Sequence, residues 1–231
     1  MTALSTQKPI EVPLLRTGDR LTRAEFERRW EAMPQLKKAE LIEGVVSIQK
    51  AVRYKQHGEP HFFLIVWLGT YSTVTPGVSG GDNCSLRFDD DNEPQPDCLL
   101  RLLPERDGRS RVDEDGYLTG APELVAEISA STSGYDLGAK LRTYARHGVQ
   151  EYVVWRVEDG EVDWFELRDG HFERLEPDAD GLIKSRVFPG LWLHVASLID
   201  NEMPTVLRHL QSGLQSEEHA QFCGFSKSQI H

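Results

Sequence analysis

Three ionisable residues stand in or beside segments that otherwise look apolar, and their types could carry out metal-dependent chemistry. Asp97 opens an apolar segment directly after Pro96, and Glu127 interrupts the apolar segment ELVAEIS at residues 123–129. Lys140 follows in a segment with helical spacing. A carboxylate is costly to bury unless it is paired or binds a metal ion, so these positions call for an explanation.

Two carboxylates and a lysine suit the metal-assisted hydrolysis of a phosphodiester. Carboxylate oxygens are hard ligands of the kind that Mg²⁺ and Mn²⁺ prefer. Such an ion lowers the pKa of bound water and neutralises charge on the phosphate, and a lysine can orient the water or stabilise the pentavalent oxygen. A second interpretation stays open, in which Glu127 and Lys140 form a part-buried ion pair that only stabilises the fold.

The strand predicted at residues 123–129 must position Glu127. Side chains alternate along a strand, so Glu123, Val125 and Glu127 share one face, and Leu124 and Ile128 belong to the other. A strand that is apolar on both faces is usually covered on both faces. We therefore expect Glu127 to be at least partly buried.

The helix predicted before Gly148 must position Lys140. At about 100° per residue, Lys140 lies at the edge of the apolar stripe that contains Leu141 and Tyr144. Arg142 lies well outside that stripe and should face solvent. A helix that packs on the sheet after the Glu127 strand would bring Lys140 towards the carboxylates.

The remaining elements predict an α/β or α+β domain with a mixed sheet. Thr22 is expected to cap a helix over residues 21–34, and the dipeptides Asp159-Gly160 and Asp169-Gly170 indicate two hairpins. Further predictions are a strand after Glu43-Gly44, a helix at 61–71, one short strand within 75–95, a strand at 97–103, a mobile polar loop at 104–122, a strand at 151–157, and a frayed tail after residue 212.

His57 and His61 have the i, i+4 spacing of a zinc-binding pair. Gly58 and Pro60 lie between them, so the sequence predicts no continuous helix through both residues. We therefore do not expect a metal site there.

Composition excludes several classes of protein. The 231 residues include three cysteines without a CxxC motif, which argues against a disulfide framework or a cysteine zinc site. The formal charge of −11 excludes a protein that holds nucleic acid by a strong overall positive field, although not one with a local basic groove. Neither a membrane-spanning run nor a signal peptide is recognisable, so a cytoplasmic protein without membrane contact is expected.

Several blocks of this sequence resemble the Uma family of predicted restriction endonucleases, a branch of the PD-(D/E)XK nuclease superfamily. The blocks are AELIEGVV at 39–46, Pro96-Asp97, the strand that carries Glu127, SASTSGYDLGAKLRTYARHGVQEYVVW at 129–155 and FPGLWLHVASLI at 188–199. Their order and spacing carry the resemblance, which covers residues 20–200. The expected organisation is an N-terminal extension (1–20), a nuclease-like domain (21–200) and a partly disordered C-terminal helix or tail (201–231).

The resemblance implies a restriction-endonuclease-like core, a mixed sheet flanked by helices with C-terminal hairpins. It implies Asp97, Glu127 and the backbone carbonyl of Ile128 as ligands of Mg²⁺ or Mn²⁺. The superfamily signature has lysine where this chain has Ser129, and in the Uma branch that lysine is shifted to the following helix, which points to Lys140. Glu40 matches the upstream acidic residue of the family, and Glu43 is the alternative.

The expected function is therefore a metal-dependent endonuclease with DNA as its substrate. Cutting both strands of a duplex needs two sites, which favours a homodimer, although the sequence has no coiled-coil or other interface signature. The alternative is a catalytically inactive binding or regulatory protein on a nuclease scaffold, because one fold hosts unrelated functions. The acidity and the lack of a separate DNA-recognition segment in the sequence favour that alternative.

Overall fold

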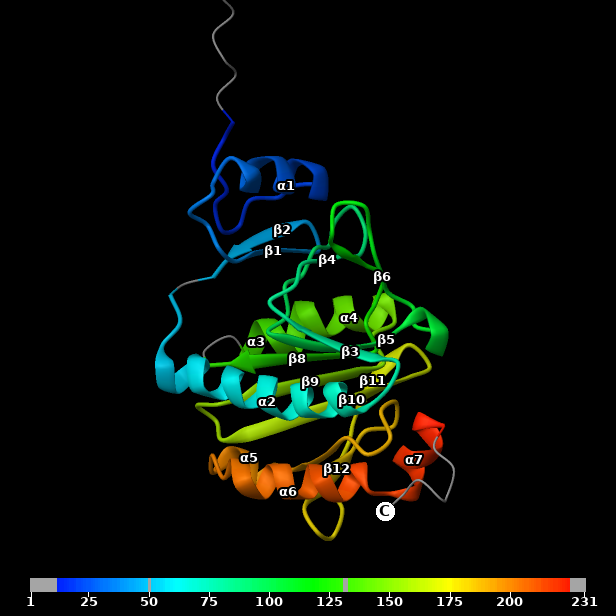
Figure 1. The fold of residues 1–231 in the computed structure, drawn as a ribbon. Helices are drawn as coiled ribbons and strands as arrows, with labels where there is room; N and C mark the ends of the chain where they lie inside the picture. Colours follow the sequence, from blue (N-terminus) through cyan, green and yellow to red (C-terminus); the bar gives the residue numbers. More distant parts are fainter. Residues whose placement is uncertain (1–11, 50, 131–132, 225–231) are drawn as a thin grey trace, which may run out of the picture.

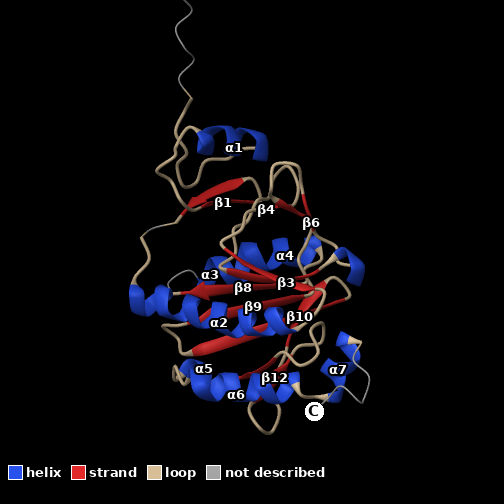
Figure 2. Ribbon diagram, viewed as in Figure 1, coloured by secondary structure: helices blue, strands red, loops and turns tan. Residues whose placement is uncertain are grey.

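The computed structural model describes residues 12–49, 51–130 and 133–224, and its centre is a six-stranded mixed sheet (Figures 1 and 2). The strand order is β11-β10-β9-β8-β5-β3. β8 and β9 run parallel, and the other neighbouring pairs are antiparallel. The strands are β3 (Val78–Asp82), β5 (Cys98–Leu102), β8 (Leu124–Ser129), β9 (Glu151–Arg156), β10 (Glu161–Arg168) and β11 (His171–Arg174). The mixed sheet and both hairpin turns agree with the sequence prediction.

Helices cover both faces of the sheet, which explains why β8 is buried throughout and β9 is buried up to Arg156 (Figure 1). One face carries α2 (Glu59–Val74), α5 (Val195–Ile199) and α6 (Met203–Leu214), which α7 (Glu217–Cys223) follows. The other face carries α3 (Ser133–Tyr135), the π-helical turn η3 (Asp136–Lys140) and α4 (Leu141–His147). Among the described residues, no helix has the length and apolar character needed to cross a membrane.

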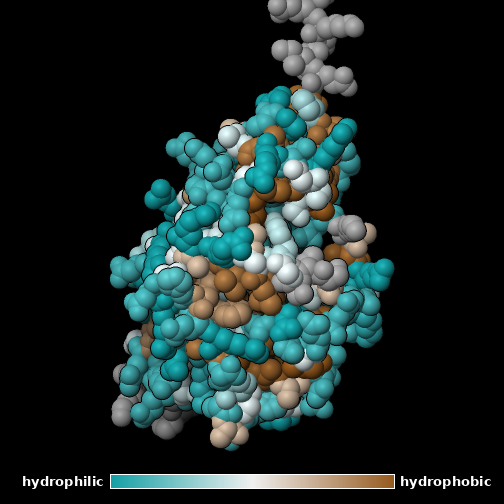
Figure 3. All heavy atoms as spheres, turned by 180° about the vertical axis from the view of Figure 1, so that it is seen from behind, coloured by the Kyte–Doolittle hydropathy of each residue, from teal (hydrophilic) through white to brown (hydrophobic). Residues whose placement is uncertain are grey.

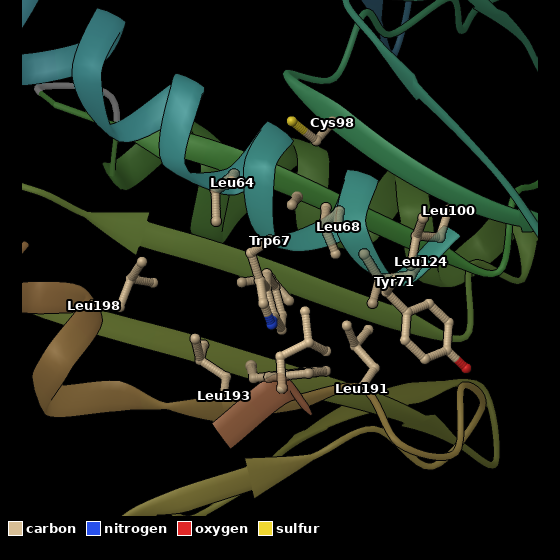
Figure 4. Packing of buried hydrophobic residues seen from close by; sticks show 14 of the residues in the cluster. Leu64, Trp67, Leu68, Tyr71, Cys98, Leu100, Leu124, Leu191, Leu193 and Leu198 are labelled. Atoms are coloured by element: carbon tan, nitrogen blue, oxygen red, sulfur yellow. The ribbon is translucent and has the colours of Figure 1, made fainter. Parts of the chain in front are cut away.

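The main apolar core fills the space between α2, the sheet and the C-terminal helices (Figure 4). Trp67 of α2 is fully buried and packs edge-on against Trp164 of β10, with ring centroids 5.6 Å apart. Within β8, Ile128 belongs to this core and Val125 to a second core under α4. The predicted alternation is therefore confirmed, and Glu127 shares the α4 face with Val125.

The N-terminal part forms a third apolar cluster from α1 (Arg23–Glu31) and the hairpin of β1 (Ala39–Ile42) and β2 (Val45–Ile48). The hairpin turn at Glu43-Gly44 has positive φ values of 52° and 72°. Leu41 of β1 exchanges backbone hydrogen bonds with Glu93, in the chain just before β5. This pairing places β1 beside residue 93, in the segment that leads to Asp97 and β5.

Short elements complete the described chain. They are η1 (Tyr54–Gly58), β4 (Leu86–Arg87), η2 (Pro104–Arg106), β6 (Arg111–Val112), β7 (Leu118–Thr119), β12 (Leu182–Lys184) and β13 (Trp192–His194). β4, β7 and β6 form a small sheet, so the predicted polar loop at 104–122 contains paired strands. The face opposite to that of Figure 1 is mostly hydrophilic, with hydrophobic residues gathered in patches near its middle (Figure 3).

Three local expectations differ from the structure. Thr22 precedes α1, but its side chain makes no capping hydrogen bond. η1 continues directly into α2, so His57 and His61 do lie on one continuous helical segment. The chain after residue 212 is not a frayed tail as far as it is described, because α7 buries His219, Ala220 and Cys223. Residues 1–11 of the predicted N-terminal extension and 225–231 of the predicted tail lie outside the described residues.

Candidate active site

Glu40, Glu127 and Lys140 meet in one buried cluster. The Lys140 ammonium lies 2.8 Å from Oε1 of Glu40 and 2.7 Å from Oε1 of Glu127. The side chains of all three residues are no more than 4% exposed. Lys140, which was predicted to lie at the edge of the apolar stripe, is thus fully buried. It contacts the carboxylates, as the packing of its helix on the sheet predicted.

Three different elements supply these side chains. β8 places Glu127 on the α4 face, and the π-helical turn η3 ends at Lys140, which points back onto that face. β1 places Glu40, whose Oε1 also accepts a hydrogen bond from the backbone N–H of Gln95 at 2.8 Å. Tyr144 of α4 donates to Oε1 of Glu127 at 2.9 Å. Contacts from the central sheet, the β1–β2 hairpin and the helix α4 therefore hold the cluster in place.

The electrostatics of the cluster follow from its burial. Desolvation raises the pKa of Glu127 to about 8, with the negative charges of Asp97 and Glu40 acting in the same direction and Lys140 opposing them. Burial alone would lower the pKa of Lys140, but the charges of Glu127 and Glu40 outweigh it and raise that pKa well above its usual value. Lys140 is therefore a protonated donor at neutral pH.

Asp97 lies next to this cluster and has its own set of partners. Its Oδ2 accepts a hydrogen bond of 2.8 Å from the backbone N–H of Ile128. Its Oδ1 accepts from Lys38 at 2.7 Å and lies 3.2 Å from Nε2 of His57. Burial raises the pKa of Asp97, but the His57 hydrogen bond and the charge of Lys38 outweigh this effect and hold it well below the usual range. Asp97, which directly precedes β5, is thus an ionised carboxylate that lies beside the end of β8.

The two alternatives for the upstream acid lie in different environments. Glu40 is fully buried and contacts Lys140. Glu43 occupies the hairpin turn and forms an exposed ion pair with Arg142, at 3.1 Å. The side chain of Arg142 is 61% exposed, as its predicted position on the helix requires. The geometry therefore places Glu40, and not Glu43, beside Glu127 and Lys140.

Sequence reasoning missed Lys38 and His57 as neighbours of Asp97. Lys38 precedes β1 and also contacts Oδ1 of Asn83 at 3.1 Å. His61 lies one turn after His57, and its Nε2 is 2.9 Å from the backbone carbonyl of Asp97. The i, i+4 histidine spacing was the available signal, since both histidines contact Asp97.

The donor chemistry of these residues fits a hard divalent cation. The charges of Asp97 and Glu40 raise the pKa of Glu127, and a cation beside these carboxylates would relieve that repulsion. Within the described residues, however, no three His, Cys, Asp or Glu side chains form a ready group of metal ligands. Lys38, His57 and Lys140 hold the carboxylate oxygens, so a metal ion would compete with them.

A cavity of about 620 Å³ adjoins this cluster. Its lining includes Gln49, Arg53, His57, Ile128 and Tyr135. The hydroxyl of Tyr135 is buried and has no hydrogen-bond partner among the described residues. The cavity therefore reaches His57 and Ile128, two of the residues that contact the Asp97 carboxylate.

Comparisons with known proteins agree with this fold. Residues 23–196 match the model of the Uma2 family, described as "Putative restriction endonuclease". The crystal structure of a "putative nuclease belonging to DUF820" from Anabaena variabilis is similar to this chain, with a TM-score of 0.56 and 15% sequence identity. The similarity covers 74% of this chain and 97% of that one. No curated protein sequence matches the chain.

Proposed function

This chain belongs to the Uma2 family, and we propose that it is a metal-dependent endonuclease that hydrolyses DNA phosphodiester bonds. The observation that carries the proposal is the buried cluster of Glu40, Glu127 and Lys140 beside the ionised Asp97. A buried site with a surplus of carboxylates and one fixed ammonium is suited to hold a cation and a phosphate together.

In this proposal, Asp97 and Glu127 are the metal-binding side chains, with the carbonyl of Ile128 as a further ligand. Mg²⁺ or Mn²⁺, when bound there, supplies Lewis-acid activation of water and neutralises phosphate charge. Ile128 fixes the Asp97 carboxylate through its backbone N–H, and Tyr144 fixes Glu127 through its hydroxyl. These contacts keep both carboxylates on the face of β8 that Lys140 approaches.

Lys140 has the role of a positively charged donor. The charges of Glu127 and Glu40 raise its pKa, which favours a protonated amine and the role of a donor over that of a general base. Its ammonium is held between Glu40 and Glu127, from where it can stabilise negative charge on a phosphate oxygen. Glu40 acts as the residue that orients Lys140 and accepts a hydrogen bond from the attacking water.

The cavity lined by Arg53, His57 and Tyr135 is the proposed path of the scissile strand. The exposed Arg53 can contact a backbone phosphate there, although the chain as a whole carries a charge of −11. With few basic contacts and a repulsive overall charge, DNA binding should be weak, and its affinity should fall steeply as the salt concentration rises. A homodimer would supply the second site that cutting of both strands requires.

The test is cleavage of plasmid and single-stranded DNA with Mg²⁺ or Mn²⁺, with and without a chelator. We expect metal-dependent cleavage that Asp97→Asn and Lys140→Ala abolish. Glu43→Gln is the matched control, because Glu43 lies in the turn after β1 and pairs with the exposed Arg142. This substitution should leave cleavage unchanged. Cleavage that persists in Asp97→Asn would overturn the proposal.

One observation favours a second candidate, a catalytically inactive binding protein on this scaffold. The carboxylates of Asp97, Glu40 and Glu127 all have cationic partners within the chain itself. Such pairing would compensate the buried charges without any metal. Calorimetric titration with Mn²⁺ separates the candidates, because only the nuclease predicts binding that is lost in Asp97→Asn.

A further inference from the structure

Exposed apolar, aromatic and basic side chains border the cavity beside the candidate active site. They belong to residues 52–55, which we call the rim and which precede α2 at the end of the sheet to which β8 points (Figure 1). Val52 is 60% exposed and Tyr54 is 68% exposed. Arg53 and Lys55 are exposed as well. Val52 and Arg53 line the cavity, and the other two residues follow directly at the start of η1.

The ring of Tyr54 is held in place although it is exposed. Its hydroxyl donates a hydrogen bond of 3.3 Å to Oε1 of Glu59. The ammonium of Lys55 lies 5.6 Å from the centre of the ring and contacts Oε2 of Glu59 at 2.8 Å. An exposed aromatic ring whose orientation is already fixed loses little conformational freedom when a flat ligand packs on it. Tyr54 is therefore suited to stack on a planar group that enters the cavity.

The charges around the rim give only weak attraction for phosphate groups. Glu59 compensates Lys55, and Glu158 adds a negative charge to the cavity lining. Arg53 forms no ion pair with another described residue, so its guanidinium is available to a phosphate. The formal charge of the whole chain is −11, which opposes this attraction. A nucleic acid bound here needs a favourable contribution that does not depend on charge.

We propose that the DNA strand that enters the active site is unpaired and that Tyr54 stacks on one of its bases. This inference rests on the proposed function and adds the form of DNA on which the site acts. A base within a duplex already stacks on its neighbours, whereas a base in a single strand can offer its face to an aromatic side chain. Stacking of this kind requires no basic surface, so it suits a chain with a large negative charge.

The dimensions of the site also favour one strand over two. The cavity has a volume of about 620 Å³, within the usual range of small-molecule sites. Recognition of a duplex buries about 1,000–2,500 Å² of protein surface and uses several phosphate contacts from lysine and arginine. Arg53 and His57 are the basic residues of the described lining. A single strand needs no more than a stacked base at Tyr54 and a phosphate at Arg53 to continue towards Asp97.

Binding in the absence of metal tests this inference separately from cleavage. We would measure the fluorescence anisotropy of a short fluorescein-labelled DNA strand, alone and annealed to its complement, in EDTA at low salt. The parent should bind the single strand roughly tenfold more tightly than the duplex, as one stacked base allows. Tyr54→Leu should lose that roughly tenfold advantage. Tyr54→Phe keeps the ring without its hydroxyl and should restore single-strand binding.

A matched control and a charge variant complete the series. Tyr117→Leu is the control, because Tyr117 is also exposed and has the guanidinium of Arg87 at 3.9 Å from its ring centre. Tyr117 lines a different pocket, beside the small sheet of β4, β6 and β7, so its replacement should leave DNA binding unchanged. Arg53→Gln should weaken single-strand binding and reduce the slope of log affinity against log salt concentration by about 0.7.

The outcomes separate this inference from the proposed function. Equal affinity of the parent for both forms of DNA, parental single-strand affinity in Tyr54→Leu, or no single-strand binding by the parent would overturn the inference. Single-strand binding that depends on Tyr54, in a protein that cleaves no DNA with Mn²⁺, would support the stacking site and contradict the proposed function. Metal-dependent cleavage of single-stranded DNA that is equally fast in Tyr54→Leu and the parent would overturn the inference alone.

Discussion

Replacing Lys140 by methionine removes the ammonium that joins two buried carboxylates while nearly conserving side-chain volume. Lys140 is 1% exposed, and its contacts with Glu40 and Glu127 are 2.8 and 2.7 Å long. Removing one partner of a buried ion pair costs about 3–5 kcal/mol, because the remaining charge is left without compensation. We therefore expect Lys140→Met to lose about 3–5 kcal/mol of unfolding free energy at pH 8.

The pH dependence of that loss has a definite sign. Burial already raises the pKa of Glu127 above that of the unfolded chain, and the loss of the opposing charge of Lys140 raises it further. Carboxyl groups with raised pKa values favour folding at low pH, and this contribution disappears as the pH rises through the folded-state pKa. The penalty of Lys140→Met should therefore shrink between pH 8 and pH 5.

Urea unfolding followed by circular dichroism at both pH values measures this effect. Arg142→Met is the matched control, since Arg142 lies two residues further along and forms an exposed ion pair with Glu43. Exposed pairs contribute about 0–1 kcal/mol, so the control should stay close to the parent at both pH values. A loss below about 1 kcal/mol for Lys140→Met at pH 8 would refute the buried cluster.

Three further predictions follow from other parts of the structure. Lys38→Met should tighten Mn²⁺ binding roughly tenfold in calorimetric titration, because it removes a charged competitor for Oδ1 of Asp97. Burial raises the pKa of Glu151 from 4.5 to about 7, so the parent loses this stabilisation as the pH rises from 4.5 through 7. Glu151→Gln should therefore gain up to about 3 kcal/mol relative to the parent between pH 5 and 8 in urea unfolding. Gly108→Ala should lower the free energy of unfolding by more than about 2 kcal/mol, because its Cβ would lie 1.9 Å from the carbonyl oxygen of Leu102.

Each of these predictions has an outcome that would contradict it. An unchanged Mn²⁺ affinity in Lys38→Met would mean that Lys38 does not compete with the metal. If the difference in unfolding free energy between Glu151→Gln and the parent stayed constant across the pH range, the raised pKa of Glu151 would be contradicted. Gly138→Ala is the control for Gly108→Ala, because nothing lies within 4 Å of its Cβ position. Equal effects of the two glycine substitutions would contradict the predicted clash.

Local periodicity was sufficient to predict the central part of the site. The alternation in β8 predicted the face of Glu127, and the helical position of Lys140 predicted its approach to the sheet. Both rules use residues within one element, whose geometry the sequence determines directly. The same applies to the hairpin at Asp159-Gly160, where a turn dipeptide joins β9 to β10.

Contacts between distant segments could not be predicted in this way. Lys38 and His57 reach Asp97 from two separate segments, and no periodicity connects them. Pro60 was expected to interrupt the helix, but it occupies the first turn of α2, where its missing N–H is tolerated. The five-residue hydrogen-bond spacing of η1, seen in the bond from Gly58 N–H to the carbonyl of Arg53, carries the chain into α2.

The ordered helix α7, after residue 212, was missed for a different reason. α7 is short, and one of its buried residues is His219, which conceals the apolar stripe that it forms with Ala220 and Cys223. His219 is accommodated because its ring contacts the Thr75 hydroxyl at 3.0 Å and the Leu214 carbonyl at 2.9 Å. Satisfied polar groups of this kind are visible only after the tertiary structure has formed.

A crystal structure of the protein soaked with Mn²⁺ tests the central claim most directly. Anomalous scattering locates manganese without reference to any assumed ligand. The account predicts a peak between Asp97 and Glu127, within coordination distance of the carbonyl oxygen of Ile128 and with Lys38 moved away from Asp97. A saturated soak that shows manganese elsewhere, or leaves both carboxylates with their lysine partners, would contradict it.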